Sequence, residues 1–313
     1  DVFPPGAVTN LAATTPGTAN ALDFTFSSPG NTLTQDPLPG GSSFYIQASS
    51  MSSTAFAPLS ADGVSVTFTT AAWLAPGSYV ARTIPGLLDN TTYFTRVFTA
   101  DPQLNWSSLS NGATVATLAK APTTLGTTYL SLFHSSATLA WAAFPVNDVS
   151  SMTAEGFRLD AASAVFTSGS GLLVLSSQTP NVLLSTLTIT GLDNNSTYYF
   201  QVNSLNWVLN RNPTQLSFRI TLPLPPEALS AAQTYTGVTS SAIRANYSVG
   251  QSSNPFALLF VTEMSTGAFP NTNFFNASTT TVVSSATFGL GGTLPVLDPN
   301  TTYYFQARNK NAQ

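Results

Sequence analysis

Hydrophobic and polar residues alternate along this 313-residue chain in short runs that are bounded by Gly, Pro, Asn and Asp. In residues 198–203, for example, Tyr, Phe and Val alternate with Tyr, Gln and Asn. A period of two residues is typical of a β-strand with one buried face. Long amphipathic helical periodicity is absent from the sequence. The pattern therefore predicts an all-β protein.

One turn, together with the strand that follows it, occurs three times. The copies are Leu87-Leu88-Asp89-Asn90-Thr91-Thr92-Tyr93-Phe94, Leu192-Asp193-Asn194-Asn195-Ser196-Thr197-Tyr198-Tyr199 and Leu297-Asp298-Pro299-Asn300-Thr301-Thr302-Tyr303-Tyr304. The tyrosines are equally spaced, since 198−93 and 303−198 both give 105. This step is too long for a solenoid repeat and fits a β-sandwich of about 100 residues. The period therefore predicts three domains.

The residue types of this corner have physical reasons. Asn tolerates the left-handed backbone conformation, and Asp and Asn side chains bond their own backbone in turns. A buried Tyr ring needs a hydrogen-bond partner for its hydroxyl, which a tyrosine corner finds in backbone a few residues upstream. We therefore expect Tyr93, Tyr198 and Tyr303 to be structural residues of three tyrosine corners.

The segment Leu297–Tyr303 resembles the corner between the fifth and sixth strands of fibronectin type III domains, and the other two copies lack only its proline. Trp141 matches the tryptophan that this family buries on its second strand, and Phe26 and Tyr247 occupy the equivalent places. The resemblance implies three tandem immunoglobulin-like, fibronectin type III-like β-sandwiches. It says little about activity, because this fold hosts many functions.

Proline-rich joins predict the domain boundaries, because Pro cannot donate to a strand ladder and stiffens a linker. We expect domain 1 at residues 1–120, domain 2 at 121–224 and domain 3 at 225–313. Domain 1 is longer than the others before its corner, and we place the excess in residues 28–41. In domain 3 we expect strands near 241–247, 256–263, 280–288 and 301–308 but no final strand, whereas its siblings have one at 113–118 and 215–222.

Charged residues make up only 7% of the chain, and the formal net charge is −4. Nucleic acid is therefore an unfavoured partner, because phosphate binding needs clustered Lys and Arg. Weak charge repulsion permits close association. No apolar run approaches the length of about 20 residues that spans a bilayer, and the absence of Cys removes the disulfide clue to compartment. The chain does not begin with Met and resembles a processed or partial chain.

Candidates for chemistry are few. His134 is the single histidine, and Asp89, Asp193 and Asp298 recur at the corners, where turn chemistry explains them. Residues 289–292 resemble a fragment of a phosphate loop, yet no helix pattern follows, which favours a strand bend. We therefore expect no catalytic residue, no metal site and no cofactor.

Binding candidates are more numerous. Glycan acceptors of the Asn-x-Ser/Thr type occur at Asn90, Asn105, Asn195, Asn246, Asn276 and Asn300, although a chain rich in Ser, Thr and Asn also produces such triplets by chance. Phe94, Tyr199 and Tyr304 follow the corner tyrosines and should point outward, either as a repeated self-association surface or against side chains of their own sheets. Trp106 and Trp207 lie in corresponding loops, where they could stack on a sugar or, as we favour, fill the joint between domains.

These observations together predict a non-enzymatic, secreted structural protein, part of a bacterial surface fibre, sheath or adhesin. The alternative is a spacer or sugar-binding accessory region of a larger secreted polysaccharide-degrading enzyme. The missing strand of domain 3 would leave an open edge. Either a continuation of the chain or a strand of another copy would close it, with Val2 and Phe3 as contacts in a head-to-tail filament.

Overall fold

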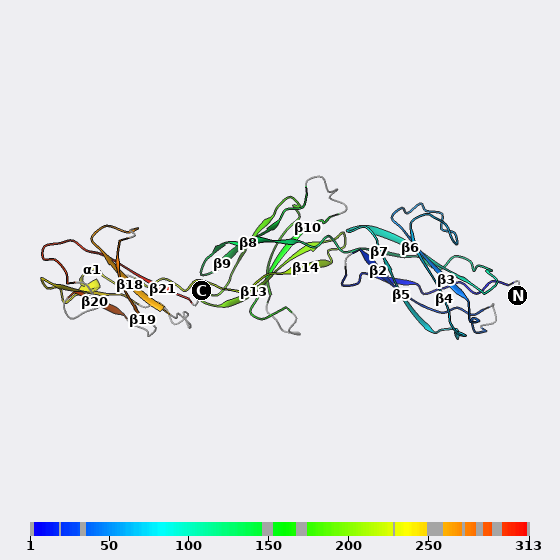
Figure 1. The fold of residues 1–313 in the computed structure, drawn as a ribbon, viewed down its shortest axis with the longest axis horizontal. Helices are drawn as coiled ribbons and strands as arrows, with labels where there is room; N and C mark the ends of the chain where they lie inside the picture. The colour runs from blue at the N-terminus through cyan, green and yellow to red at the C-terminus, as the bar shows by residue number, and fades with distance from the viewer. Residues whose placement is uncertain are drawn as a thin grey trace.

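The computed structural model describes residues 3–18, 20–31, 36–145, 153–166, 174–227, 229–248, 259–270, 273–279, 284–289 and 296–311. Three β-sandwiches follow one another in a row, with the N-terminal end of the chain at one extreme of the row. The C-terminal end lies beside domain 2 rather than at the other extreme (Figure 1). In the described residues, no strand pairing crosses the predicted boundaries near 120 and 224. The exact boundary residues remain a prediction.

Domain 1 consists of a three-stranded and a four-stranded antiparallel sheet. The first contains, in spatial order, β1 (Ala12–Thr14), β2 (Ala21–Ser27) and β5 (Tyr79–Pro85), and the second contains β4 (Val64–Thr69), β3 (Ser43–Ser49), β6 (Thr92–Ala100) and β7 (Ala113–Ala116).

Domain 2 repeats this arrangement. One sheet has the order β12 (Thr186–Thr190), β9 (Ser136–Ala142) and β8 (Thr123–Leu132), and the other has the order β11 (Val174–Thr179), β10 (Gly156–Ala162), β13 (Thr197–Leu205) and β14 (Arg211–Gln215). A short β15 (Arg219–Ile220) pairs with the start of β13 and continues the line of β14.

Domain 3 has two three-stranded sheets. They contain β16 (Tyr235–Thr236), β17 (Ala242–Asn246) and β20 (Ser285–Gly289), and β19 (Phe275–Thr279), β18 (Leu259–Ser265) and β21 (Tyr304–Lys310), while α1 (Ala231–Thr234) precedes β16. Within the described residues, β21 pairs with β18 on one side and with no strand on the other.

This strand order is that of a fibronectin type III sandwich, so the fold predicted from the three corners is confirmed. Phe26, Trp141 and Tyr247 are all buried and hold the same place in each core. Each lies six residues after Asn20, Ser135 or Ser241, whose carbonyls accept the N–H of the corner leucine. Thus one backbone bond fixes both the corner and the register of the large core ring.

Some strand predictions were wrong. Of the strand expected near 280–288 of domain 3, the structure describes residues 284–288, which lie in or next to β20 (Ser285–Gly289), and β19 (Phe275–Thr279), in the other sheet, was not predicted. Strand β8 was not predicted from the sequence. Register shifts between Thr124 and Tyr129 and between Tyr129 and Ser131 interrupt the alternation of its side chains. The extra length of domain 1 is not concentrated in residues 28–41. Residues 28–42 separate β2 from β3, and residues 143–155 separate β9 from β10, so that loop is only two residues longer.

Candidate functional site

Each of the three corners contains the same type of hydrogen bond. The hydroxyls of Tyr93, Tyr198 and Tyr303 accept the backbone N–H five residues upstream, at 2.9, 2.9 and 2.8 Å respectively. The donors are the N–H groups of Leu88, Asp193 and Asp298. Each tyrosine hydroxyl therefore supplies the hydrogen-bond acceptor for one backbone N–H of its corner.

The asparagine of each corner adopts a positive φ, 47° at Asn90, 47° at Asn195 and 56° at Asn300. This is the left-handed conformation that Asn tolerates. Burial raises the pKa of Tyr93 and of Tyr198, and the backbone N–H that each hydroxyl accepts lowers the pKa in part. The neutral hydroxyl is therefore the form that the corner holds.

The corner of domain 1 forms a joint with the loop between β13 and β14 of domain 2. Asn206 Nδ2 donates to the Thr117 carbonyl at 2.9 Å, and the N–H of Trp207 donates to Asn90 Oδ1 at 3.2 Å. Asn90 Nδ2 in turn donates to Glu155 Oε1 at 2.8 Å. Asn90 is fully buried by these contacts, so the first joint is a specific polar interface.

The second joint reproduces the central bond of the first. Asn311 Nδ2 donates to the carbonyls of Thr221, at 3.1 Å, and Ile220, at 2.9 Å. Asn311 is Asn206 moved by the repeat, since 311−206 gives 105. Thr117 and Thr221 are also equivalent, because each hydroxyl donates to two carbonyls of its own corner. Equivalent asparagines thus form both joints, Asn206 between domains 1 and 2 and Asn311 between domains 2 and 3.

Asp101 holds the same position in domain 1. Its Oδ1 accepts the N–H of Gln103 and of Asn105, and its Oδ2 accepts Asn105 Nδ2. A carboxylate cannot donate to a carbonyl as Asn206 does. The loop after β6 in domain 1 therefore keeps the turn and lacks the side-chain donor that Asn206 and Asn311 use at the joints.

The two loop tryptophans turn out to hold different positions. Trp207 directly follows Asn206, and 52% of its surface is exposed beside the first joint. The ring of Trp106 packs edge-on against Tyr45, with centroids 6.2 Å apart. Trp106 therefore belongs to the outer face of domain 1, and only Trp207 lies at a joint.

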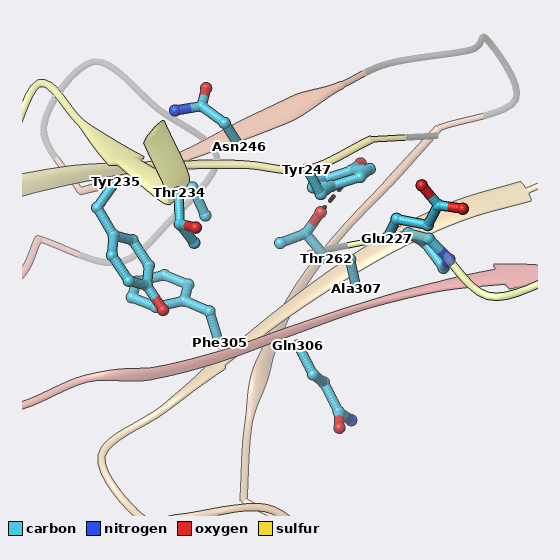
Figure 2. Close-up of a pocket in the computed structure, with 11 residues that line it drawn as sticks. Glu227, Thr234, Tyr235, Asn246, Tyr247, Thr262, Phe305, Gln306 and Ala307 are labelled. Carbon is cyan, nitrogen blue, oxygen red and sulfur yellow. Dashed lines mark hydrogen bonds between the residues drawn. The ribbon is translucent and has the colours of Figure 1, made fainter. Parts of the chain in front are cut away.

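A cavity of about 220 Å³ opens at the unpaired edge of domain 3. Tyr235 and Phe305 form one wall, with ring centroids 5.4 Å apart, and Ala307 lies further along β21 (Figure 2). Thr262 Oγ1 donates to the Tyr247 hydroxyl at 3.2 Å on the opposite side. In domain 2, β14 and the residue after it, Leu216, lie beside the equivalent strand.

Two replacements enlarge this cavity. Ala307 is the repeat of Val97 and Val202, which are both fully buried, and is smaller by two methyl groups. Thr262 pairs with Ala307 and occupies the place at which Leu159 pairs with Val202. Both changes reduce the apolar volume of the core on the same side as the open edge.

The outward aromatics differ from one another in their contacts. Tyr199 lies against Phe218 of its own domain, with ring centroids 5.9 Å apart, while Tyr304 is 42% exposed. Phe94 is half-buried. Among the candidates near the N-terminus, Phe3 is 67% exposed, and Val2 lies outside the described residues.

The glycan acceptors are unequally accessible. Asn90 and Asn195 are buried, and a sugar on Asn90 Nδ2 would displace its bond to Glu155. The side-chain amide of Asn105 donates to Asp101, and that of Asn246 donates to Gln233 and Thr236. Asn276 and Asn300 are exposed. Burial thus disfavours glycosylation of Asn90 and Asn195, and of the six predicted acceptors Asn276 and Asn300 have exposed side chains.

Buried carboxylates are the feature that sequence reasoning missed. Asp160, on the outer side of β10, is fully buried and accepts Arg158 at 2.7 Å, Asn203 at 2.9 Å and Gln201 at 3.2 Å. Glu263 repeats this place in domain 3 and pairs with Arg308 and Gln306. The signal available in the sequence was a single acid in the middle of a strand in a chain with so few charges. Buried charges of this kind need such partners.

The other candidates do not form a site. His134 is exposed in the turn between β8 and β9. Gly289 has a φ of 100°, and a Cβ there would overlap the Ser241 carbonyl, which explains the glycine; residues 290–292 lie outside the described ranges. Within those ranges, no group of three or more acidic or His side chains could hold a metal ion. Among the described residues, no helix is long and apolar enough to cross a membrane.

Comparison with known proteins gives structural likeness only. No protein-family profile and no curated protein sequence matches the chain. Among solved structures, the FN1–FN3 domains of chicken CNTN1 are 12% identical, with a TM-score of 0.28, and the comparison covers 98% of this chain and 94% of that one. A two-domain fibronectin type III segment of chicken tenascin is 14% identical, with a TM-score of 0.34, and covers 69% of this chain and 99% of that one. The fold assignment rests on the strand order described above.

Proposed function

We propose that this chain is a non-enzymatic, extracellular structural protein, a rod of tandem sandwiches that forms part of a surface fibre, sheath or adhesin. The observation that carries the proposal is the repeated joint, in which Asn206 and Asn311 donate to equivalent carbonyls of the preceding domain. A spacer needs a fixed distance and direction between its domains. A joint that repeats at both domain boundaries supplies both.

The contacts around the first joint support rigidity. Besides the Asn206 bond, Asn212 Nδ2 donates to the Ala119 carbonyl at 2.7 Å, and the N–H of Lys120 donates to the Thr153 carbonyl at 2.7 Å. These bonds hold the linker itself. Buried hydrogen bonds of this kind cost free energy to break without replacement.

The composition of the chain supports a role in assembly. With only 7% charged residues, neighbouring rods repel one another weakly. The partners that we propose are other copies of the chain, at the ends of the rod, and glycans on exposed polar surface. Neither nucleic acid nor a membrane is needed for this role.

A distance measurement tests the rod. The chain contains no Cys, so cysteines introduced at the exposed Ser65 and Ser176 would carry spin labels at these positions alone. We expect one narrow distance distribution between domains 1 and 2, and a broader one in Asn206→Ala. Asn210→Ala, in the same loop but without a bond to domain 1, is the matched control. A broad distribution in the unchanged chain would contradict the proposal.

The assembly role needs a second experiment. Negative-stain electron microscopy of the concentrated chain should show rods joined end to end. Separate rods at every concentration would contradict self-association and leave the rod itself intact.

A further inference from the structure

We propose that a cleft between β4 and β5 of domain 1 binds a saccharide chain that carries carboxylate groups. The cleft would hold one sugar ring against exposed aromatic side chains and pair its carboxylate with Arg82. This inference rests on the proposed function and deepens it, because it gives the glycan partner a place and a chemical class.

The cleft lies between the edge strands of the two sheets of domain 1 and has a volume of about 390 Å³ (Figure 1). Trp73 and Tyr79 line it, and 70% and 74% of their surfaces are exposed. No other aromatic side chain of the described residues is as exposed as these two. Exposed aromatic rings that gather in one hollow mark a binding surface.

An insertion builds one wall of this cleft. Phe68 of β4 is equivalent to Thr179 of β11, because each pairs with the buried phenylalanine of the neighbouring strand. Arg82 of β5 is equivalent to Leu187 of β12, since 187−82 gives the period of 105. The two positions are separated by 82−68 = 14 residues in domain 1 and by 187−179 = 8 residues in domain 2. The difference of 14−8 = 6 residues lies in the segment that contains Trp73.

Backbone hydrogen bonds hold the inserted segment in place. Thr70 exchanges two of them with residues 41–42, both at 2.8 Å, and Leu74 exchanges two with Leu38, both at 2.9 Å. Leu38 is fully buried, and Leu74 packs against the same core. Trp73 lies between these anchors. Its ring is therefore positioned before a ligand arrives, which lowers the entropy cost of binding.

Arg82 gives the cleft its charge. It stands where domain 2 has Leu187, a side chain that is only 9% exposed, and it is the single charged residue in the lining of the cleft. Its guanidinium lies over the Phe68 ring, 4.1 Å from the centroid, and Nη1 donates to the Ala81 carbonyl at 2.7 Å. Among the described residues, no carboxylate pairs with it. A guanidinium has five donors and binds a carboxylate through two of them at once. Charge complementarity therefore selects an anionic ligand.

A saccharide suits this cleft better than an acidic peptide. One face of a pyranose ring is flat and carries C–H groups, which can lie against an exposed ring such as that of Trp73. Its hydroxyls can exchange hydrogen bonds with Thr69 and Tyr79, whose hydroxyls line the cleft. Peptide side chains need apolar pockets, but Phe44 and Val80, at the floor of the cleft, are buried in the core.

A binding experiment tests the proposal on the unchanged chain. The probes are fluorescent tetrasaccharides of galacturonic acid and of mannuronic acid. We expect saturable binding of at least one of them by fluorescence anisotropy, weakened by added salt because salt screens an exposed charge pair. The methyl ester of the same tetrasaccharide, which lacks the charges, should bind about tenfold more weakly.

Two variants and their matched controls locate the site. Arg82→Leu installs the residue of domain 2 and should weaken binding about tenfold. Arg219→Leu removes a guanidinium that lies over Tyr129 of domain 2, at 4.3 Å, and should leave binding unchanged. Trp73→Ala should also weaken binding about tenfold, whereas Trp207→Ala, at the other exposed tryptophan, should not. Unchanged melting temperatures show that the variants remain folded.

Three results would overturn the inference. They are absence of binding of both tetrasaccharides at millimolar concentration, equal binding by Arg82→Leu, and equally tight binding of a tetraglutamate peptide, which would assign the cleft to acidic peptides. None of these would alter the spin-label distance between domains 1 and 2 or the end-to-end contacts of rods. Failure of the cleft is therefore distinguishable from failure of the proposed function.

Discussion

Domains 2 and 3 share the same strand order and the same corner, yet their cores are closed to different degrees. Phe200 of domain 2 is 1% exposed, whereas Phe305, its repeat in domain 3, is only half-buried. The difference follows from the strand that lies beside Phe200 and from the smaller residue at Ala307. The corner and the central strands therefore define the sandwich, while the last strand completes its core.

The largest expected difference concerns these two phenylalanines. Phe200→Ala should lower the free energy of unfolding of domain 2 by about 3–5 kcal/mol, because it leaves a cavity in a closed core. Phe305→Ala should cost domain 3 about half as much or less, since part of that ring is already solvated. Trp141 fluorescence during denaturation reports domain 2, and hydrogen exchange reports domain 3, which has no Trp. Equal losses would show that the third core is as closed as the second.

The corner tyrosine should have the next largest effect. Tyr198→Phe should destabilise domain 2 by about 1–2 kcal/mol, because the N–H of Asp193 loses its acceptor. Tyr199→Phe, on the outer face of the same strand, should change stability by less than about 0.5 kcal/mol. Denaturation curves that reversed this order would place the strand register one residue out.

Filling the hollow core should partly remove the difference between the domains. Ala307→Val restores the residue of Val97 and Val202 and should stabilise domain 3 by about 0.5–1.5 kcal/mol. The matched change Val202→Ala should destabilise domain 2. Hydrogen exchange of β21 and β13 measures both. Destabilisation by Ala307→Val would mean that the cavity has no room for the side chain.

The smallest effect concerns the corner carboxylate of domain 1, Asp89. Burial raises the pKa of Asp89, and Lys120 lowers it in part. An acid whose folded pKa is raised contributes stability that is present below the ordinary pKa of 3.8 and is lost as pH rises through the folded value. Asp89→Asn should therefore flatten the pH dependence of the stability of domain 1 in that window. An unchanged profile in Asp89→Asn would contradict this account.

The sequence revealed the parts of the fold that depend on local chemistry. Asn at a positive φ, a buried Tyr five residues after its donor and strict alternation along β13 can all be read from neighbouring residues. The buried rings at Phe26 and Trp141 could be predicted for the same reason.

Features that depend on distant parts of the chain were hidden. The joint unites Asn206 with Thr117, two residues that belong to different domains, and no local pattern marks either as an interface residue. The burial of Asp160 depends on Arg158, Asn203 and Gln201, of which two lie on a strand more than 40 residues away. Alternation placed these side chains on the outer face and could not show that they bury one another.

Among the described residues, β21 has no strand on the side away from β18, and residue-resolved amide hydrogen exchange tests this most directly. In domain 2 the amides of Phe200 and Val202 face β14 and should be protected. Their repeats Phe305 and Ala307 should exchange at least tenfold faster, while Gln306, whose amide faces β18, should be protected. Protection of Phe305 and Ala307 equal to that of Phe200 and Val202 would contradict an open edge.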